Sequence, residues 1–405
     1  MRNFKIKIIG GTKGSALFLV PLMISGCCVG RVIGGLAPAC PGGAGRLGAV
    51  AYDAVLVMSF GGPEGPDDVM PFLENVVRGR GVPRERLLAV AEHYLHFGGV
   101  SPINQQCRDL IDALREDFAA NGVDLPIYWG NRNWHPMMAD TFAQMRADGI
   151  QNALGFATSA YGGYSSCRQY WEDIAKATEA VGEGAPRVHK LRQFWDHPGF
   201  VAPHADALRD ALATLDPARR DTTRIVFTAH SIPTSMAATA GPSGGRYEAQ
   251  LHETATLVAD GLDLPWDLVW QSRSGPPQVP WLEPDVNDHL TALAEKGVTD
   301  VVVSPIGFVS DHLEVVWDLD NEAKETAASL GLGYARAGTP GHDPRYVAMV
   351  RELVLERLAS SDEGAPFTVP QPVCVSAPAQ RLGNLPVWDY CAVDCCRPPA
   401  RPSSR

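Results

Sequence analysis

Short, continuous apolar runs recur along the chain from residue 53 onward, and each run ends in small or polar residues. The first three runs cover 54–59, 125–130 and 153–158, and helical patterns over 109–121 and 138–149 separate them. Apolar residues at successive rather than alternate positions predict strands that are buried on both faces, as in a parallel sheet. The alternation of strands and helices therefore predicts an α/β fold with right-handed crossovers.

A second series of the same kind follows at 224–229, 268–271 and 300–305. Two such series predict two similar doubly wound (Rossmann-like) domains, and we place the N-terminal α/β half at 51–205 and the C-terminal α/β half at 206–360. Ligand sites in these folds lie at the carboxyl ends of the strands, so we expect the active site in the cleft between the halves. No Gly-x-Gly-x-x-Gly motif follows any of these strands, which argues against a nucleotide cofactor.

Residues 1–50 differ in composition from the rest of the chain. Basic residues precede an apolar run at 16–24, and the sequence Ile-Ser-Gly-Cys then ends at Cys27. This order is typical of a lipoprotein signal, which would export the protein. Glycine- and alanine-rich sequence continues to Gly48, however, and the first strand begins only after Val50, which favours a mis-assigned start. We adopt a mis-assigned start or a dispensable extension, either of which makes the protein cytoplasmic, and keep an exported lipoprotein as the alternative.

Composition and charge narrow the classes of partner. Hydrophobic residues make up 45% of the chain and charged residues 20%, as in soluble globular proteins. The formal net charge is −11, and no dense run of Lys and Arg occurs. A nucleic-acid surface needs such a basic face, so we expect no nucleic-acid partner. We expect a monomer, and the sequence leaves membrane association open.

Two segments carry side chains suited to metal or proton chemistry. His230 follows the first strand of the second series, where a side chain opens onto the ligand face of the sheet, although a lone histidine there is more often a packing or capping residue. Glu314, Asp318 and Glu322 are spaced four apart, so a helix would carry them as one acidic stripe. Because this stripe begins just after an apolar strand, we favour a path for a divalent cation or for protons over a solvated helix face. The loop 271–285 is dense in Pro and Gly and predicts a rigid cleft wall.

Several segments resemble the signature segments of ferrochelatases. They are His-Ser-Ile-Pro from His230, Ser-Arg-Ser-Gly-Pro-Pro from Ser272, Ser-Asp-His-Leu-Glu-Val-Val-Trp-Asp from Ser310, and the opening segments Ser-Phe-Gly-Gly-Pro-Glu-Gly-Pro from Ser59 and Phe-Gly-Gly-Val-Ser-Pro-Ile-Asn from Phe97. The resemblance runs from about Tyr52 to about Leu358, with the motifs in the family's order. Gly-Asn-Arg-Asn-Trp from Gly130 and the tyrosine-rich segment from Tyr164 resemble the actinobacterial branch.

The resemblance implies a chelatase-like fold and a lyase that inserts Fe²⁺ into a porphyrin in haem biosynthesis. It places His230 and Glu314 at the porphyrin centre as the catalytic pair and the Fe²⁺ ligands, with Asp318 and Glu322 along a path for protons or metal. Imidazole and carboxylate bind Fe²⁺ without holding it irreversibly, which suits an ion that must be handed on. Which of His230 and Glu314 takes the pyrrole protons stays open.

Alternatives to this function follow from the same residues. Imidazole and carboxylate do not choose sharply among first-row divalent ions, so insertion of cobalt or nickel is the nearest one. The N-terminal segment suggests another, an exported haem- or metal-binding lipoprotein that uses a chelatase fold without turnover. The intact set of His230, Glu314 and Asp318 argues against this second alternative.

The resemblance also implies the contacts to the porphyrin. It places Ser101 and Tyr170 at the porphyrin site, and Arg78 and Arg80 are candidate partners of the propionates. Phe60 stands where some relatives carry Tyr or Met near the metal, and its side chain cannot ligate iron. The actinobacterial features favour coproporphyrin III, with four propionates, over protoporphyrin IX, with two.

Cysteines concentrate in residues 361–405, which are rich in Pro and Ser and predict an irregular tail. Nine cysteines are present in all, and in a cytosolic protein such a thiol cluster is more often metal-binding than disulfide-bonded. Some ferrochelatases hold a [2Fe–2S] cluster with one internal and three C-terminal cysteines, and such a cluster needs four ligands. An oxidisable tail is the alternative. The candidate ligands are Cys167 and three of Cys374, Cys391, Cys395 and Cys396.

Overall fold

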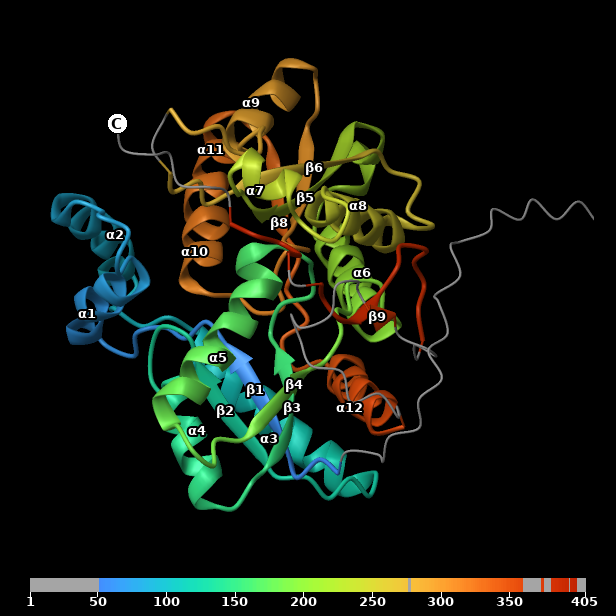
Figure 1. Cartoon of the computed structure of the whole chain (residues 1–405). Coiled ribbons are helices and arrows are strands. Elements are labelled where there is room, and N and C mark those ends of the chain that lie inside the picture. Colours follow the sequence, from blue (N-terminus) through green and yellow to red (C-terminus); the bar gives the residue numbers. More distant parts are fainter. Residues whose placement is uncertain (1–50, 276–277, 360–372, 375–379, 393, 399–405) are drawn as a thin grey trace, which may run out of the picture. The chain divides into compact units, whose positions relative to one another are not determined.

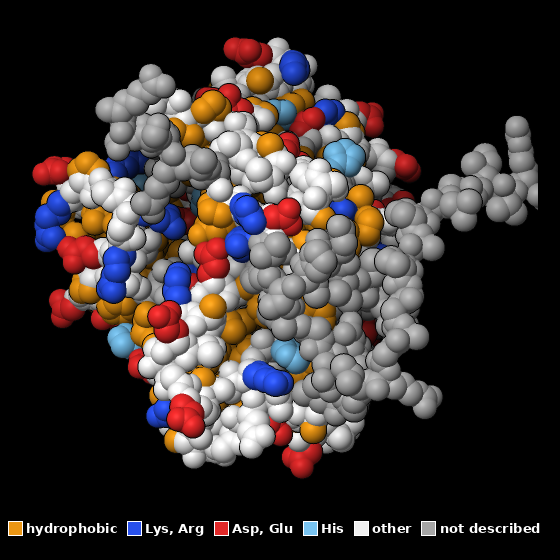
Figure 2. Space-filling model, in the orientation of Figure 1, with side chains coloured by type: hydrophobic (Ala, Val, Ile, Leu, Met, Phe, Trp, Pro, Cys, Tyr) orange, Lys and Arg blue, Asp and Glu red, His pale blue; other side chains and the backbone are white. Residues whose placement is uncertain are grey.

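The computed structural model describes residues 51–275, 278–359, 373–374, 380–392 and 394–398 (Figure 1). The leader predicted over residues 1–50 lies outside the described residues. Within the described ranges, no helix combines the length and the apolar composition that crossing a membrane requires. On the face in Figure 2, acidic and basic side chains are interspersed over the described surface.

The first sheet is built as the apolar runs predict. Its four strands are all parallel, in the order β2-β1-β3-β4. All six residues of β1 are buried, because alternate side chains enter hydrophobic clusters on opposite faces of the sheet. The helices α3, α4 and α5 contribute to these two clusters. The bounds are β1 Ala54–Ser59, β2 Ile127–Asn131, β3 Asn152–Ala157, β4 Arg187–Lys190, α3 Ile103–Ala120, α4 Met138–Ala147 and α5 Gln169–Val181.

The second sheet repeats the topology of the first. It is also parallel, and its order is β6-β5-β7-β8, so in both sheets the first strand in sequence lies between the second and the third. This repetition confirms the prediction of two doubly wound α/β units. The bounds are β5 Thr223–His230, β6 Trp266–Gln271, β7 Asp300–Ser304, β8 Gly333–Arg336, α6 Pro198–Ala213, α8 Arg246–Ala259, α9 Val286–Glu295 and α11 Lys324–Ser329.

Three further features distinguish the chain from a plain pair of sheets. The helices α1 and α2 lie side by side between β1 and β2 in sequence (Figure 1), and a hydrophobic cluster of their own includes Leu313. The helix α12 packs against α3 and α6. Two segments, η1 and η3, are π-helices. The bounds are α1 Pro66–Val76, α2 Arg84–His96, α12 Pro344–Leu358, η1 Tyr164–Arg168, η2 Pro217–Thr222, α7 Thr234–Ala238, α10 Leu313–Val315, η3 Val316–Ala323, β9 Val373–Cys374 and β10 Trp388–Tyr390.

The described part of the C-terminal tail is fastened to the body of the protein. Arg381 pairs with the buried carboxylate of Asp196, with 2.8 Å between Nε and Oδ2. The backbone amide of Asn384 donates to Glu253 on α8. Two residues of the tail, β9, pair with β10 as a short antiparallel ladder. The contacts with Asp196 and Glu253 therefore hold the described tail residues to the body, whereas the β9–β10 ladder joins two parts of the tail itself.

A close backbone approach joins the carboxyl ends of β5 and β7. The amide of Gly307 donates to the carbonyl of Thr228 over 3.0 Å, and the Tyr161 hydroxyl donates to the carbonyl of Ile306 over 2.6 Å. A Cβ atom on residue 307 would lie 2.5 Å from the Cβ of Ala229. Glycine is therefore required here for steric reasons, and the approach brings the segment after β7 next to His230.

Replacement of this glycine should destabilise the protein. In Gly307→Ala, the added methyl group overlaps Ala229, so we expect unfolding free energy to fall by about 1–3 kcal/mol, as for overpacking of a core. Urea titration followed by circular dichroism measures this change. Gly338→Ala is the matched control, because a Cβ there meets no atom within 4 Å. Equal stability of the two variants would contradict the steric requirement.

Candidate functional site

His230 presents one ring nitrogen to the site and uses the other to fix its orientation. Its Nδ1 lies 2.5 Å from the carbonyl oxygen of Ser231. A carbonyl can only accept, so Nδ1 carries the hydrogen, and in the neutral ring Nε2 holds the free lone pair. The hydroxyl of Tyr247 donates to the His230 carbonyl over 2.9 Å and holds the backbone there.

Glu314 faces this lone pair from the start of α10. Its Oε2 lies 3.8 Å from the Nε2 of His230, and the two side chains are 47% and 33% exposed. The distance is too long for a direct hydrogen bond. The side chain of His312 caps α10 by accepting from the Val315 amide over 3.4 Å. The structure therefore brings together the imidazole and the carboxylate that the sequence analysis paired.

Asp318 is the most strongly perturbed carboxyl group near this pair. It accepts hydrogen bonds from Gln271, over 3.1 Å, and from the Ser272 hydroxyl. Burial raises its pKa to about 7, the nearby charges of Glu314 and Glu322 add to the rise, and the two hydrogen bonds oppose it. Ser272 itself has a positive φ of 60°.

Most of the acidic stripe lies on a π-helix, which the spacing of the carboxylates did not predict. After the single turn of α10 the chain continues as the π-helix η3, which carries Asp318 and Glu322. The π-helix is rare and is frequently found at functional sites. Glu322 is exposed, and its charge acts on both Asp318 and Asp285. Glu314 and Glu322 are thus exposed carboxylates on either side of the more buried Asp318, and Glu322 lies near the start of α9.

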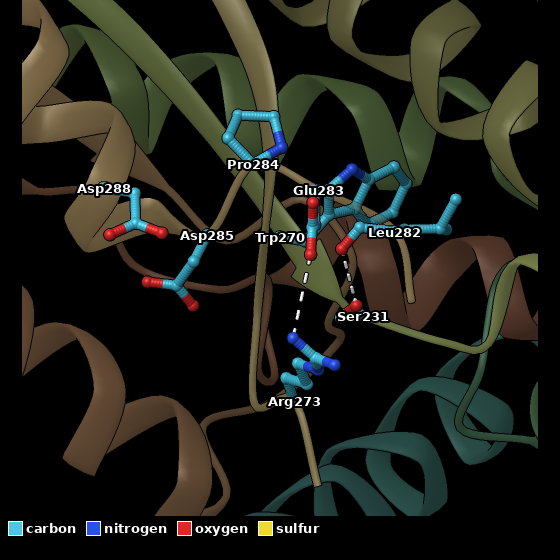
Figure 3. Close-up of a pocket in the computed structure, with 8 residues that line it drawn as sticks. All are labelled: Ser231, Trp270, Arg273, Leu282, Glu283, Pro284, Asp285 and Asp288. Carbon is cyan, nitrogen blue, oxygen red and sulfur yellow. Dashed lines mark hydrogen bonds and ion pairs between the residues drawn. The ribbon is translucent and has the colours of Figure 1, made fainter. Parts of the chain in front are cut away.

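A cavity of about 390 Å³ is lined by Ser231, the residue that follows His230 in sequence (Figure 3). The Ser231 hydroxyl donates to the carbonyl of Leu282, and Arg273 lies 3.6 Å from the carboxylate of Glu283. Burial raises the pKa of Asp285, whose side chain caps α9. Arg273 and residues 282–285 of this loop therefore line a pocket, in agreement with the predicted cleft wall. The lining residues are Ser231, Trp270, Arg273, Leu282, Glu283, Pro284, Asp285 and Asp288.

The helix α2 packs against the segment that holds Glu314. The rings of His93 and Trp317 stack with centroids 3.9 Å apart and planes 7° from parallel. Burial, and then the charge of Glu314, raise the pKa of Tyr94. Since Leu313 belongs to the hydrophobic cluster of α1 and α2, these helices border the site.

The predicted porphyrin contacts occupy different environments. Phe60 is 37% exposed and packs edge-on against Phe72, with ring centroids 6.3 Å apart. Ser101 is buried, and its amide donates to the carbonyl of Pro63, beside Phe60-Gly-Gly. Tyr170 is buried as well, so its side chain meets protein groups in this structure.

Arg132 is a functional candidate that the sequence analysis did not single out. Its guanidinium lies 4.3 Å from the ring centroid of Tyr170 and pairs with the carboxylate of Asp173 over 2.5 Å. It also donates to the Ser165 carbonyl on η1. Arg132 lies in the segment Gly-Asn-Arg-Asn-Trp, which resembles the actinobacterial branch. Neither its spacing nor its charge distinguishes it from the other arginines of the chain.

Arg78 and Arg80 are both exposed between α1 and α2. Burial and the neighbouring Glu172 raise the pKa of Tyr164, and the Arg80 guanidinium is close enough to oppose that rise. Arg80 is thus placed near the tyrosine-rich segment. Arg78 shows no such link to the predicted site among the interactions of the described residues.

Four of the predicted thiols lie together, and the side chain of Cys374 is outside the described residues. Cys167 on η1 contacts Cys391, Cys391 contacts Cys395, and the sulfur atoms of Cys395 and Cys396 are 3.6 Å apart. The Gly241 amide donates to the Cys396 sulfur over 3.0 Å. Across the described residues, no three His, Cys, Asp or Glu side chains are already arranged to hold a metal, so these thiols are neighbours rather than a preformed ligand set.

Comparison with known proteins places this site in a family. The family model described as "Ferrochelatase" matches residues 52–358. "Coproporphyrin III ferrochelatase" of Nocardia farcinica is 55% identical over 365 residues, which are 88% of this chain and 99% of the relative. The protein of the same name from Mycolicibacterium vanbaalenii is 58% identical over 76% of this chain and 90% of its own.

A further relative comes from outside the actinobacterial genera named above. "Ferrochelatase" of Rhodopirellula baltica is 53% identical over 86% of this chain and 95% of its own. Among solved structures, SirB from Bacillus subtilis aligns with a TM-score of 0.48 and 12% identity over 77% of this chain and 97% of that one, which is too distant to bear on the assignment. On the strength of the sequence matches, the chain belongs to the ferrochelatase family, the lyases that insert Fe²⁺ into porphyrins.

Proposed function

We propose that this enzyme inserts Fe²⁺ into coproporphyrin III, and that His230 and Glu314 together bind the metal substrate. One observation carries the proposal, the 3.8 Å between His230 Nε2 and Glu314 Oε2. Imidazole nitrogen and carboxylate oxygen bind a first-row ion such as zinc at about 2.0–2.2 Å. An ion between the two atoms would therefore be within bonding distance of both, without movement of either side chain.

The two ligands suit an ion that is held only briefly. A nitrogen and an oxygen ligand leave most coordination positions to water and then to the porphyrin nitrogens, and neither binds Fe²⁺ as firmly as thiolates would. The hydrogen bond from Nδ1 to Ser231 keeps Nε2 as the basic atom of His230. Since this atom cannot hold a proton and a metal ion at once, metal binding and proton uptake at His230 belong to different steps.

Asp318 and Glu322 supply a route for protons away from the pair. A carboxyl group with a pKa of about 7 can accept and release a proton at neutral pH. Asp318 lies within electrostatic reach of Glu314 on one side and of the exposed Glu322 on the other. We therefore assign Asp318 to proton relay, with Glu322 at the solvent end.

The relatives named coproporphyrin III ferrochelatase support the choice of porphyrin. Arg78 and Arg80 are exposed and free to meet propionates from solvent, while Phe60 offers an apolar surface. We further propose a cytoplasmic monomer with no nucleic-acid partner. Protoporphyrin IX is the alternative substrate.

We also propose that Cys167, Cys391, Cys395 and Cys396 hold a [2Fe–2S] cluster. Four thiols linked by successive contacts, Cys167 to Cys391 to Cys395 to Cys396, match the ligand number that such a cluster needs, although they would have to converge to bind it. Hydrogen bonding to Cys391 and burial raise the pKa of Cys167, so metal binding at this thiol must displace its proton. When bound, the cluster would cross-link the tail to η1, where Arg168 already donates to the Cys395 carbonyl over 2.7 Å.

Anaerobic insertion assays test the proposed reaction. With Fe²⁺, we expect the wild-type enzyme to turn over coproporphyrin III faster than protoporphyrin IX, and His230→Ala and Glu314→Gln to lose turnover while keeping the wild-type circular dichroism spectrum. The assay is repeated with Co²⁺ to compare metals. Retained turnover in His230→Ala would refute the metal-binding pair, and preference for protoporphyrin IX would refute the proposed substrate.

The raised pKa of Asp318 predicts a pH dependence of stability. Above its ordinary pKa of 3.8 this carboxyl loses its proton in the unfolded chain, whereas the folded protein keeps the proton up to about pH 7. The folded state then binds more protons, so stability falls as pH rises from about 4 to about 7. Asp318→Asn should make this fall shallower in urea titrations across that range.

Asp148→Asn serves as the control for this measurement. Hydrogen bonds from Gln144 and Tyr128 lower the pKa of Asp148, so its contribution to the pH dependence has the opposite sign. We expect this variant to retain the fall in stability. An unchanged slope in Asp318→Asn would show that the carboxyl does not hold its proton in the folded state.

The cluster proposal has a spectroscopic test that does not depend on turnover. Protein purified without oxygen should absorb visible light and contain iron and inorganic sulfide in equal amounts. Cys395→Ser should lose both signals, while Cys107→Ser should keep them, because Cys107 is a buried thiol on α3 outside the group of four. Wild-type protein that stays colourless and sulfide-free after anaerobic reconstitution would rule the cluster out.

A further inference from the structure

Arg336, the last residue of β8, binds two carboxylates near the candidate site. Its Nε and Nη2 atoms donate to the two carboxylate oxygens of Asp320 over 2.7 and 2.9 Å. Its Nη1 and Nη2 atoms donate to Asp311 over 3.1 and 3.4 Å. The guanidinium is 17% exposed and its partners are 20% and 38% exposed, so the contacts are largely sheltered from solvent.

The two partners of Arg336 flank the proposed site residues in sequence. Asp311 precedes α10, and Asp320 lies in the middle of η3. Glu314 and Asp318 fall between them. One guanidinium therefore holds both ends of the segment that carries the two acidic groups assigned above to metal binding and proton relay.

The segment needs such support because of its backbone. The π-helix is less favourable than the α-helix and persists where its surroundings fix it. The hydroxyl of Tyr334, also on β8, donates to the Leu319 carbonyl over 2.7 Å. Two side chains of one strand thus bind η3 from the same side, and Arg336 alone also reaches Asp311.

We propose that Arg336 is a positioning residue for metal insertion, which sets the place of Glu314 and Asp318 relative to His230. This inference rests on the proposed function of those residues. Arg336 acts through Asp311 and Asp320 and does not touch the metal. The planar fork of a guanidinium serves two carboxylates at fixed angles, which the single ammonium of lysine cannot do.

Substitutions of Arg336 test the proposal in insertion assays. We expect Arg336→Met and Arg336→Lys both to lower kcat by about 10- to 100-fold, the scale of a misplacement near 1 Å, with the KM for porphyrin within twofold of wild type. Asp320→Asn weakens the same contact but leaves Arg336 in place. It should also lower kcat, and this result would show that the loss does not depend on misfolding of the Arg336 variants.

Arg224→Met is the matched control. Arg224 lies at the start of β5 in the same sheet and makes the same kind of two-pronged pair, with Asp267, over 2.6 and 3.0 Å. Its loss should reduce stability and leave kcat within twofold of wild type. A purely structural role for Arg336 predicts equal effects of Arg224→Met and Arg336→Met on kcat, which would overturn the proposal. Full activity in Arg336→Lys would also overturn it, since charge alone would then suffice.

His230→Ala and Glu314→Gln are assayed alongside. If these two variants retain turnover, the proposed metal-binding pair fails, and with it the reason for a positioning residue. If they are inactive while Arg336→Met, Arg336→Lys and Asp320→Asn remain active, only the role of Arg336 fails.

Discussion

The close packing of Gly307 against Ala229 is the constraint on which the candidate site depends. Without a side chain at residue 307, the chain leaving β7 reaches the backbone of β5 and binds the Thr228 carbonyl. His230 is the next residue after Ala229, and the chain beyond Gly307 leads into α10. One backbone contact between neighbouring strands thus carries an imidazole and a carboxylate to within 3.8 Å.

The carboxylates around this pair fall into two groups, those that pair with a cation and one that does not. Asp311 and Asp320 share one guanidinium, which fixes them as structural anions. Asp318 has hydroxyl and amide donors but no such cation among its hydrogen-bond partners in the described structure, and burial raises its pKa to about 7. The same short segment therefore contains rigid charges that hold the backbone and one group that can exchange protons at neutral pH.

The tail thiols and the candidate site are linked by common elements. Arg168 on η1 binds the Cys395 carbonyl, and the Gly241 amide, soon after α7, binds the Cys396 sulfur. The π-helix η1 leads directly into Tyr170, and α7 follows His230 by a few residues. The thiols therefore contact two segments that are adjacent in sequence to proposed porphyrin and metal contacts.

The sequence by itself determined the two parallel sheets, because strands such as β1 are apolar at five successive positions, 54–58, and only burial on both faces accommodates such a run. It also determined His230, Glu314 and Asp318 as candidates, since local motifs carry them. Only the tertiary structure decided the 3.8 Å distance between His230 and Glu314, the π-helical form of η3, and the pairing of Arg336 with Asp311 and Asp320. These depend on contacts between residues far apart in sequence, such as Gly307 with Ala229 and Arg336 with Asp311, and periodicity holds no information about them.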